Sequence, residues 1–253
     1  MTNKLKYFIA NWKMFGDLKS INILNRVNTF LIKNLKYSKN TNVIFCVPHT
    51  LIYFLANTFK KKSLLIGTQN CHSNRTDGSY TGSINAKMIK NSGAKYIILG
   101  HSENRREGET NKIIRQKIDS ALNQKLKIIL CIGESLREKK SKKTFSIIKK
   151  QIKDSLSKKF KLNNIILAYE PIWSIGTGRV PKSNELQKTL KFIKENFRKL
   201  FKTRNFPKVL YGGSVSPKNV ISFSRINEID GFLIGKDSRS SKKFIDIIKN
   251  YYK

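Results

Sequence analysis

The segment that decides the fold runs from residue 165 to residue 178 and reads Ile165-Ile166-Leu167-Ala168-Tyr169-Glu170-Pro171-Ile172-Trp173-Ser174-Ile175-Gly176-Thr177-Gly178. Its apolar start predicts a buried strand, and Glu170 stands where that strand ends. The spaced glycines Gly176 and Gly178 predict a hinge in the loop that follows. The segment therefore predicts a general base at the mouth of a barrel, attached to a loop that can close over it. The alternative is a buried glutamate that caps a helix through an ordinary glycine turn.

The same unit of strand, turn and amphipathic stretch recurs along the chain. Eight short, nearly continuous apolar runs are expected to be strands, at residues 7–13, 42–48, 63–70, 96–102, 127–134, 164–171, 208–215 and 231–238. Such runs are typical of parallel strands that helices cover on the outside. Because no Pro-, Gly- or Ser-rich linker divides the chain, we expect one domain over residues 1–253. The predicted fold class is α/β, a (β/α)8 barrel of eight parallel strands with outer helices.

Composition argues against several classes of protein. No apolar run approaches the roughly 20 residues that a membrane span needs. Residues 1–6 run into the first strand without a small-residue cleavage site, so no signal peptide is expected. The three cysteines, Cys46, Cys71 and Cys131, are far apart and lie in or beside apolar runs. This favours reduced thiols over a disulfide framework or a zinc site, which predicts a cytoplasmic protein without a metal.

The formal net charge of +35 raises the question of a polyanionic partner. Such an excess of Lys and Arg can indicate nucleic-acid binding. Here, however, the basic residues are spread over nearly every expected helix and loop, and Lys, Asn and Ile are abundant together, as a coding bias would produce. We therefore expect a solvated basic surface, with neither a nucleic-acid nor a membrane partner. That surface would still attract a small phosphorylated substrate.

Unusual polar residues stand at the expected strand ends, where barrels of this type carry their chemistry. They are Asn11, Lys13, Gln69, Asn70, His101, Glu103, Glu134, Glu170, Ser214 and the segment from Gly235 onward. Strand alternation would point Asn11 and Lys13 to the same face. After the seventh and eighth runs, the turn Tyr211-Gly212-Gly213-Ser214 and the pair Gly235-Lys236 could present backbone N–H groups to an anion. The pattern predicts one shared site with a place for a phosphate.

These stretches resemble the triosephosphate isomerase family over essentially the whole chain. The matching motifs are Ala10-Asn11-Trp12-Lys13-Met14, Gly67-Thr68-Gln69-Asn70, Asp77-Gly78-Ser79-Tyr80-Thr81-Gly82, Gly100-His101-Ser102-Glu103, Cys131-Ile132-Gly133-Glu134 and the segment from Glu170 to Gly178. The resemblance implies a TIM barrel that interconverts dihydroxyacetone phosphate and glyceraldehyde 3-phosphate through an enediolate. It implies a role in glycolysis and gluconeogenesis, and chemistry that needs neither a metal nor an organic cofactor.

The resemblance also implies a role for each catalytic residue. Glu170 would move the proton between the two substrate carbons, and a neutral His101 would polarise the carbonyl. Asn11 would hydrogen-bond the substrate, and Lys13 would stabilise negative charge. Glu103 would orient Lys13 without transferring a proton itself.

The resemblance also implies which groups bind the substrate phosphate and how two subunits associate. The backbone N–H groups at Gly176, Ser214, Gly235 and Lys236 would hold the phosphate. The loop around Thr81 would insert into a neighbouring subunit beside the catalytic lysine, which makes an obligate homodimer. A plain surface hairpin or Ω-loop is the alternative for that loop.

Three departures from the family pattern leave other functions open. Asn104 stands before Arg105-Arg106, where the family has two arginines directly after the glutamate. Residues 235–238 read Gly-Lys-Asp-Ser in place of Gly-Gly-Ala-Ser, so Asp237 adds negative charge near a dianion. Ser83 follows Gly82 where an acidic residue is usual. The alternatives are an impaired barrel that only binds a phosphorylated ligand, and a polyanion-binding protein that uses the basic surface.

Overall fold

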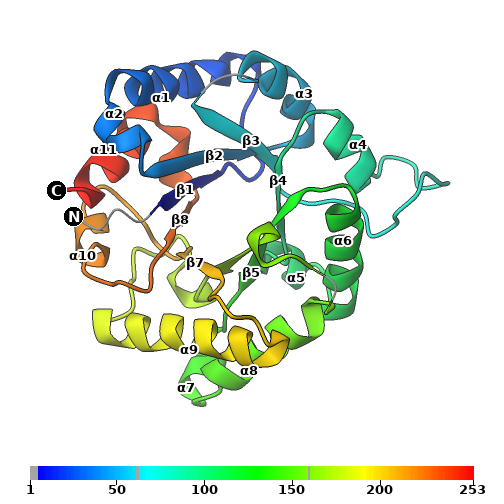
Figure 1. Ribbon diagram of the computed structural model, residues 1–253, viewed down its shortest axis with the longest axis vertical. Coiled ribbons are helices and arrows are strands. Elements are labelled where there is room, and N and C mark those ends of the chain that lie inside the picture. Colours follow the sequence, from blue (N-terminus) through cyan, green and yellow to red (C-terminus); the bar gives the residue numbers. More distant parts are fainter. Residues whose placement is uncertain (1–4, 61–62, 159) are drawn as a thin grey trace.

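Eight parallel strands close into a barrel in the order in which they occur in the sequence. They are β1 (Lys6–Asn11), β2 (Thr41–Val47), β3 (Leu64–Thr68), β4 (Tyr96–Leu99), β5 (Lys127–Ile132), β6 (Ile165–Tyr169), β7 (Lys208–Tyr211) and β8 (Gly231–Ile234). The computed structural model describes residues 5–60, 63–158 and 160–253. Figure 1 shows the strands enclosed by a ring of helices. The predicted (β/α)8 barrel is confirmed.

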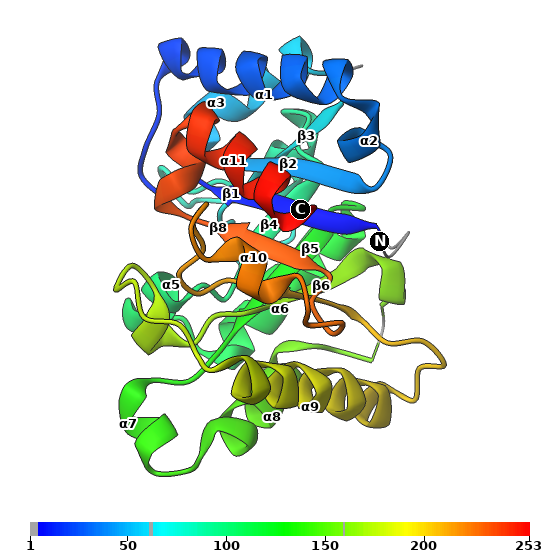
Figure 2. The same ribbon diagram turned by 90° about the vertical axis from the view of Figure 1, so that its left-hand side faces the viewer.

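The helices lie outside the barrel and pack their apolar faces against it. They are α1 (Ile21–Lys33), α2 (Leu35–Ser38), α3 (His49–Thr58), α4 (Ala86–Asn91), α5 (Ser102–Arg106), α6 (Asn111–Asn123), α7 (Leu136–Lys140), α8 (Thr144–Ser155), α9 (Ser183–Phe201), α10 (Val220–Phe223) and α11 (Ser241–Tyr251). In α9, Leu186, Leu190, Ile193 and Phe197 recur at three- and four-residue spacing and are fully buried. Figure 2 shows α1 and α9 on opposite flanks of the barrel. Among the helices in the described ranges, none has the length and apolarity required to cross a bilayer.

Each strand buries both of its faces, as expected for parallel strands. In β5, Ile129 and Cys131 point into the barrel, where they pack in one cluster with residues such as Ile98 and Leu210. The alternate residues of β5, such as Leu130, belong to the outer cluster between strands and helices. Burial raises the pKa of the Cys131 thiol well above its ordinary value, with the nearby Glu170 charge acting in the same direction.

The strands end earlier than the predicted runs, which had included the polar residues beyond them. β1 ends at Asn11, and Lys13 adopts a left-handed conformation with φ of 56°. β4 ends at Leu99, where Gly100 turns the chain with φ of 72°. Asn11 is thus the last residue of β1, whereas Lys13 reaches the mouth of the barrel through a tight turn rather than through strand alternation. Lys13 and His101 belong to the turns that leave the sheet.

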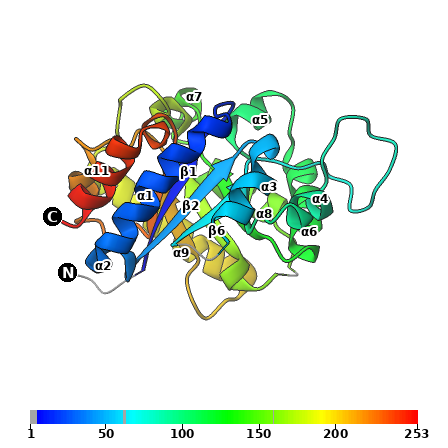
Figure 3. The same cartoon turned by 90° about the horizontal axis from the view of Figure 1, so that it is seen from above.

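One other feature of the sequence lies away from the barrel wall. The loop between β3 and α4 extends well beyond the body of the molecule in Figure 3. Residues 75–83 of this loop, which include Thr81, are all exposed. The first four residues, on which the expectation of no signal peptide partly rests, lie outside the described residues.

A buried carboxylate stands at the opposite, N-terminal end of the strands. Asp230, which is 1% exposed, precedes β8 and accepts a hydrogen bond of 3.0 Å from the backbone N–H of Val209 in β7. Its Oδ2 lies 2.7 Å from Nζ of Lys194, which is itself buried on α9. The Nζ of Lys208 is 3.5 Å from Oδ1. Asp230 therefore joins two strands to the longest outer helix.

Replacing Asp230 with Asn should destabilise the fold strongly. The substitution removes the negative charge and leaves the buried Lys194 ammonium without full compensation, which costs about 3 kcal/mol or more. Glu185→Gln is the matched control, because Glu185 pairs with Lys139 at 2.6 Å in an exposed position outside the Thr81 loop. That pair should contribute less than about 1 kcal/mol. Denaturant unfolding at a fixed protein concentration measures both, and equal losses for the two variants would contradict the assignment.

Candidate active site

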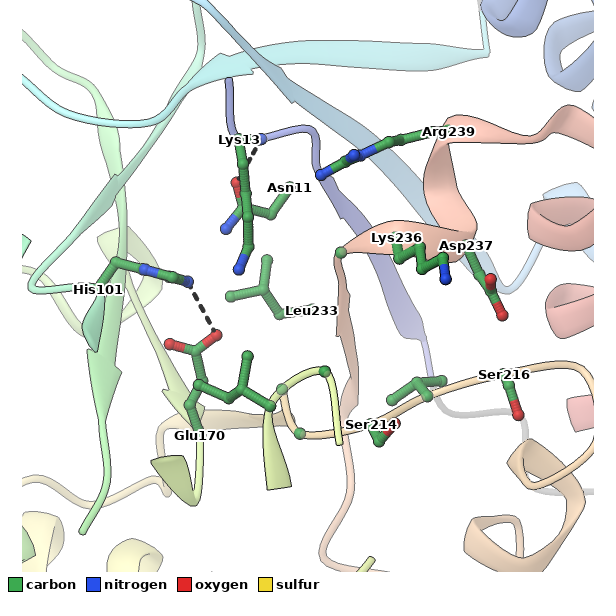
Figure 4. A pocket seen from close by; sticks show the side chains of 16 residues that line it. Asn11, Lys13, His101, Glu170, Ser214, Ser216, Leu233, Lys236, Asp237 and Arg239 are labelled. Carbon is green, nitrogen blue, oxygen red and sulfur yellow. Dashed lines mark hydrogen bonds and ion pairs between the residues drawn. The ribbon is translucent and has the colours of Figure 1, made fainter. Parts of the chain in front are cut away.

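The C-terminal ends of the strands surround one cavity of about 290 Å³. Eight residues that the sequence predicts for the site line it: Asn11, Lys13, His101, Glu170, Gly176, Ser214, Gly235 and Lys236. They come from five different strand ends or the loops after them, and Figure 4 shows His101, Glu170 and Lys13 facing one another. Glu103, the ninth predicted residue, does not line the cavity but contacts Lys13.

Glu170 directly follows β6 and is held between two glycine-containing turns. Its backbone N–H donates a 2.8 Å hydrogen bond to the carbonyl of Ile132 in β5. A Cβ on Gly133 would collide with the Glu170 carbonyl, and one on Gly212 would lie 2.7 Å from the Glu170 Cγ. The carboxylate is 4% exposed. Its Oε2 is buried, and its Oε1 is the oxygen that lies toward His101.

His101 is oriented by the first turn of α5. Its Nδ1 accepts a 3.2 Å hydrogen bond from the backbone N–H of Glu103, so the imidazole serves as the N-cap of this short helix. An imidazole that accepts at Nδ1 carries its proton on Nε2 when it is neutral. The Nε2 lies 3.5 Å from Oε1 of Glu170. The ring therefore presents an N–H donor to the cavity beside a carboxylate.

Lys13 is fixed from two sides. Its backbone N–H donates to Oδ1 of the buried Asn11 at 3.2 Å, and its Nζ donates to Oε1 of Glu103 at 2.6 Å. Burial alone would raise the pKa of Glu103, but the hydrogen bond from Lys13 and the charges of His101, Lys13 and Arg106 lower it overall. Glu103 is therefore ionised near neutral pH and holds the ammonium at the mouth of the cavity.

The loop after Glu170 is tied to the turn after β7 through Ser174. The Ser174 Oγ donates to the carbonyl of Arg179 at 2.5 Å, accepts from the backbone N–H of Ser214 at 3.2 Å, and lies 3.0 Å from the Tyr211 hydroxyl. Burial raises the pKa of Tyr211 to about 12, so this hydroxyl keeps its proton. Beyond Ser174, residues 176–180 are exposed, and Gly176 and Gly178 have positive φ. This is the geometry of a hinged lid with one fixed end.

A second set of contacts holds the aromatic part of this loop. The Trp173 indole N–H donates to Oε1 of the buried Glu134 at 3.0 Å, and the Tyr169 hydroxyl donates to the same carboxylate at 3.2 Å. Burial raises the pKa of Glu134, while these two hydrogen bonds act in the opposite direction. The Lys139 ammonium lies 3.9 Å from the centroid of the Trp173 ring. Hydrogen bonds and a cation–π contact thus hold the first residues of the loop after Glu170.

Asp237, which departs from the family pattern, forms an ion pair with a lysine on α11. Its Oδ1 accepts a 3.2 Å hydrogen bond from Lys243 on α11, and Figure 4 shows the carboxylate directed away from Glu170. A 3-10 turn, Lys236–Arg239, separates β8 from α11, so the helical stretch expected after Gly235 begins as this turn. Asp237 lines the same cavity as Gly235 and Lys236, and the negative charge that departs from the family pattern is paired there with Lys243.

The arginine that follows Asn104 is bound to main-chain carbonyls and to a side-chain amide oxygen. The Arg105 guanidinium donates to the carbonyl of Gly100 at 2.7 Å and to Oδ1 of Asn111 at 2.6 Å. Glu109 pairs instead with the buried Lys117. The local ion pair is therefore formed by Glu109 and Lys117, and His101 still lines the cavity.

Several residues of the site were not singled out from the sequence. These are Tyr169, Trp173, Ser174, Tyr211 and Arg239. Tyr169 and Tyr211 read as strand core because only their polar ends take part, and Trp173 and Ser174 stood in the predicted lid segment without a role of their own. Arg239 stood among many basic residues, and nothing in its local sequence marked it.

Comparisons with known proteins agree with this geometry. The family model described as triosephosphate isomerase matches residues 6–251. A triosephosphate isomerase from Mycoplasmopsis pulmonis is 38% identical, with 95% of each chain covered, and one from Alkaliphilus oremlandii is 36% identical, with 94% of this chain and 96% of that protein covered. The crystal structure of triosephosphate isomerase from Bartonella henselae superposes with a TM-score of 0.86 at 31% identity, over 98% of this chain and 99% of that one. The chain therefore belongs to the triosephosphate isomerase family.

Proposed function

We propose that this chain interconverts glyceraldehyde 3-phosphate and dihydroxyacetone phosphate through an enediolate, with Glu170 as the base. The observation that carries the proposal is the pairing of a buried carboxylate with an imidazole N–H at 3.5 Å, in one cavity with a fixed ammonium. The carboxylate removes a proton from one substrate carbon and returns it to the next. The N–H of His101 and the amide of Asn11 stabilise the charge that develops on the two oxygens. Lys13 supplies the permanent positive charge.

The phosphate is held on the other side of the cavity. Ser214, Gly235 and Lys236 line this region and would offer backbone N–H groups to the phosphate, and Gly176 in the lid completes it on closure. The Ser214 N–H would exchange its hydrogen bond to Ser174 Oγ for one to the phosphate. Closing the lid excludes water, which protects the enediolate from losing its phosphate. Because Asp237 is neutralised by Lys243, the departure that suggested an impaired barrel gives that alternative no support.

We further propose a cytoplasmic homodimer formed through the Thr81 loop. Apolar surface around the catalytic lysine supports this, since Met14 is 99% exposed next to Lys13 and Tyr80 in the loop is 49% exposed. Exposed apolar surface of this kind marks an interface. A second copy of the chain would cover Met14 with its own loop.

The base is tested by shortening it. Glu170→Asp keeps the carboxylate but withdraws it by about 1 Å, which should lower kcat about 100-fold or more and leave KM nearly unchanged. Glu195→Asp on the outer helix α9 is the control and should keep the activity of the parent. Steady-state kinetics in both directions measure the effect. An unaltered kcat in Glu170→Asp would refute the assignment.

The basic surface should make the reaction depend on salt. A chain with a formal charge of +35 attracts a dianionic substrate, and raising ionic strength from about 0.01 to 0.2 M screens that attraction. We expect kcat/KM to fall over this range while kcat stays constant. A flat dependence would show that the charge does not steer the substrate.

The loop is tested by placing a charge at its tip. Thr81→Asp would bury an unpaired carboxylate in the proposed interface and should raise the dissociation constant of the dimer by about 100-fold or more. Ile221→Asp, at an exposed apolar position on α10, is the control and should remain dimeric. Analytical ultracentrifugation distinguishes the two. Equal sedimentation of both variants and the parent would exclude this loop from the interface.

A further inference from the structure

Arg239 brings an additional cation to the cavity. It ends the 3-10 turn that follows β8, and it lines the same cavity as Lys13 and Lys236. Figure 4 shows its side chain extending from the β8 side toward Asn11 and Lys13. Glu170 and His101 lie at the far side of the cavity in that view, so Arg239 stands apart from the proton-transfer groups.

The guanidinium of Arg239 is held in place by an aromatic stack. Its central carbon lies 4.9 Å from the centroid of the Phe15 ring. Phe15 in turn meets Trp12 edge-on at 6.0 Å, and the Trp12 indole N–H donates to the carbonyl of Ser238 at 3.4 Å. Stacking occupies one face of a guanidinium and leaves its N–H edge free for an oxyanion. The first and eighth loops together thus present this edge at the mouth.

Arg239 forms no ion pair with any residue that the structure describes. Its Nε is buried and has no hydrogen-bond partner in the parts of the chain that the structure describes. Two nearby carboxylates are already engaged, Asp237 with Lys243 and Glu103 with Lys13. A buried donor without a partner costs free energy unless a ligand supplies the acceptor. The acceptor that fits a fixed guanidinium is a phosphate, which it can bind through two hydrogen bonds.

We propose that Arg239 is a further substrate-binding residue, which donates hydrogen bonds to the phosphate dianion of the substrate from the side of the eighth loop. The inference rests on the proposed function for the identity of the substrate, but its ligand class is any small phosphate dianion. Arg239 adds side-chain charge to a subsite otherwise built from backbone N–H groups. It takes no part in moving the proton.

The test compares Arg239→Met with Arg239→Lys. Methionine keeps much of the apolar stem and removes the charge, so the dissociation constant for inorganic phosphate and the KM should both rise about tenfold, with a smaller change in kcat. Lysine keeps the charge without the planar fork, so its effect should be smaller. Isothermal titration calorimetry with inorganic phosphate and steady-state kinetics provide the two readouts.

The matched control is Arg198→Met. Arg198 on α9 also stacks on a phenylalanine, with its central carbon 4.7 Å from the Phe206 ring, but it does not line the cavity. It should leave phosphate binding unchanged. An Arg239→Met variant that melts at a lower temperature but binds phosphate as the parent does would overturn the proposal, because the residue would then be only structural. If Arg239→Met does not fold, a phosphate affinity of Arg239→Lys equal to or tighter than that of the parent overturns it, and a weaker one supports it.

Different results would refute the proposed isomerase function and the proposed role of Arg239. A parent chain that binds inorganic phosphate but does not isomerise triose phosphates refutes the proposed function, while the calorimetric comparison of Arg239 variants keeps its meaning. An active parent whose phosphate affinity is indifferent to Arg239→Met refutes only the role of Arg239.

Discussion

The close approach of three strand ends around one carboxylate is the constraint on which the site depends. Glu170 has its backbone bonded to β5 through Ile132, and Gly212 after β7 donates its N–H to the carbonyl of Tyr169 at 2.8 Å. Side chains at Gly133 or Gly212 would occupy the space of Glu170 itself. A carboxylate buried this tightly keeps one geometry, and proton transfer requires that geometry. The lid begins at the next residue, so its base is fixed by the same contacts.

Charged groups lie at increasing distances around the Glu170 carboxylate. The carboxylate and imidazole face each other in the cavity, and Lys13 is held beside them by Glu103. Farther out, Asp237 is paired with Lys243, which leaves the eighth loop positive toward the cavity. The chain as a whole carries a formal net charge of +35. Substrate attraction therefore increases from long-range, screened charge to fixed donors at short range.

The barrel and the predicted site residues could be read from the sequence because each depends on local patterns. Apolar runs gave the strands, and polar residues directly after them gave Asn11, His101 and Glu170. The strand ends were placed too late, since the left-handed turn at Lys13 and the glycine turn at Gly100 cannot be told from strand by apolar content. The contacts of Ser174 with Tyr211, of Trp173 with Glu134 and of Arg239 with Phe15 join distant segments. No local pattern encodes such pairs.

The most direct test of the account is kcat/KM of the purified chain with glyceraldehyde 3-phosphate in a coupled assay. A buried, pre-oriented base beside an imidazole N–H, with a lid that excludes water, predicts a value near the diffusional ceiling of about 10⁸–10⁹ M⁻¹s⁻¹. A value many orders of magnitude lower, in protein shown to be folded, would contradict it. The cavity would then be one that binds a phosphorylated ligand without turning it over.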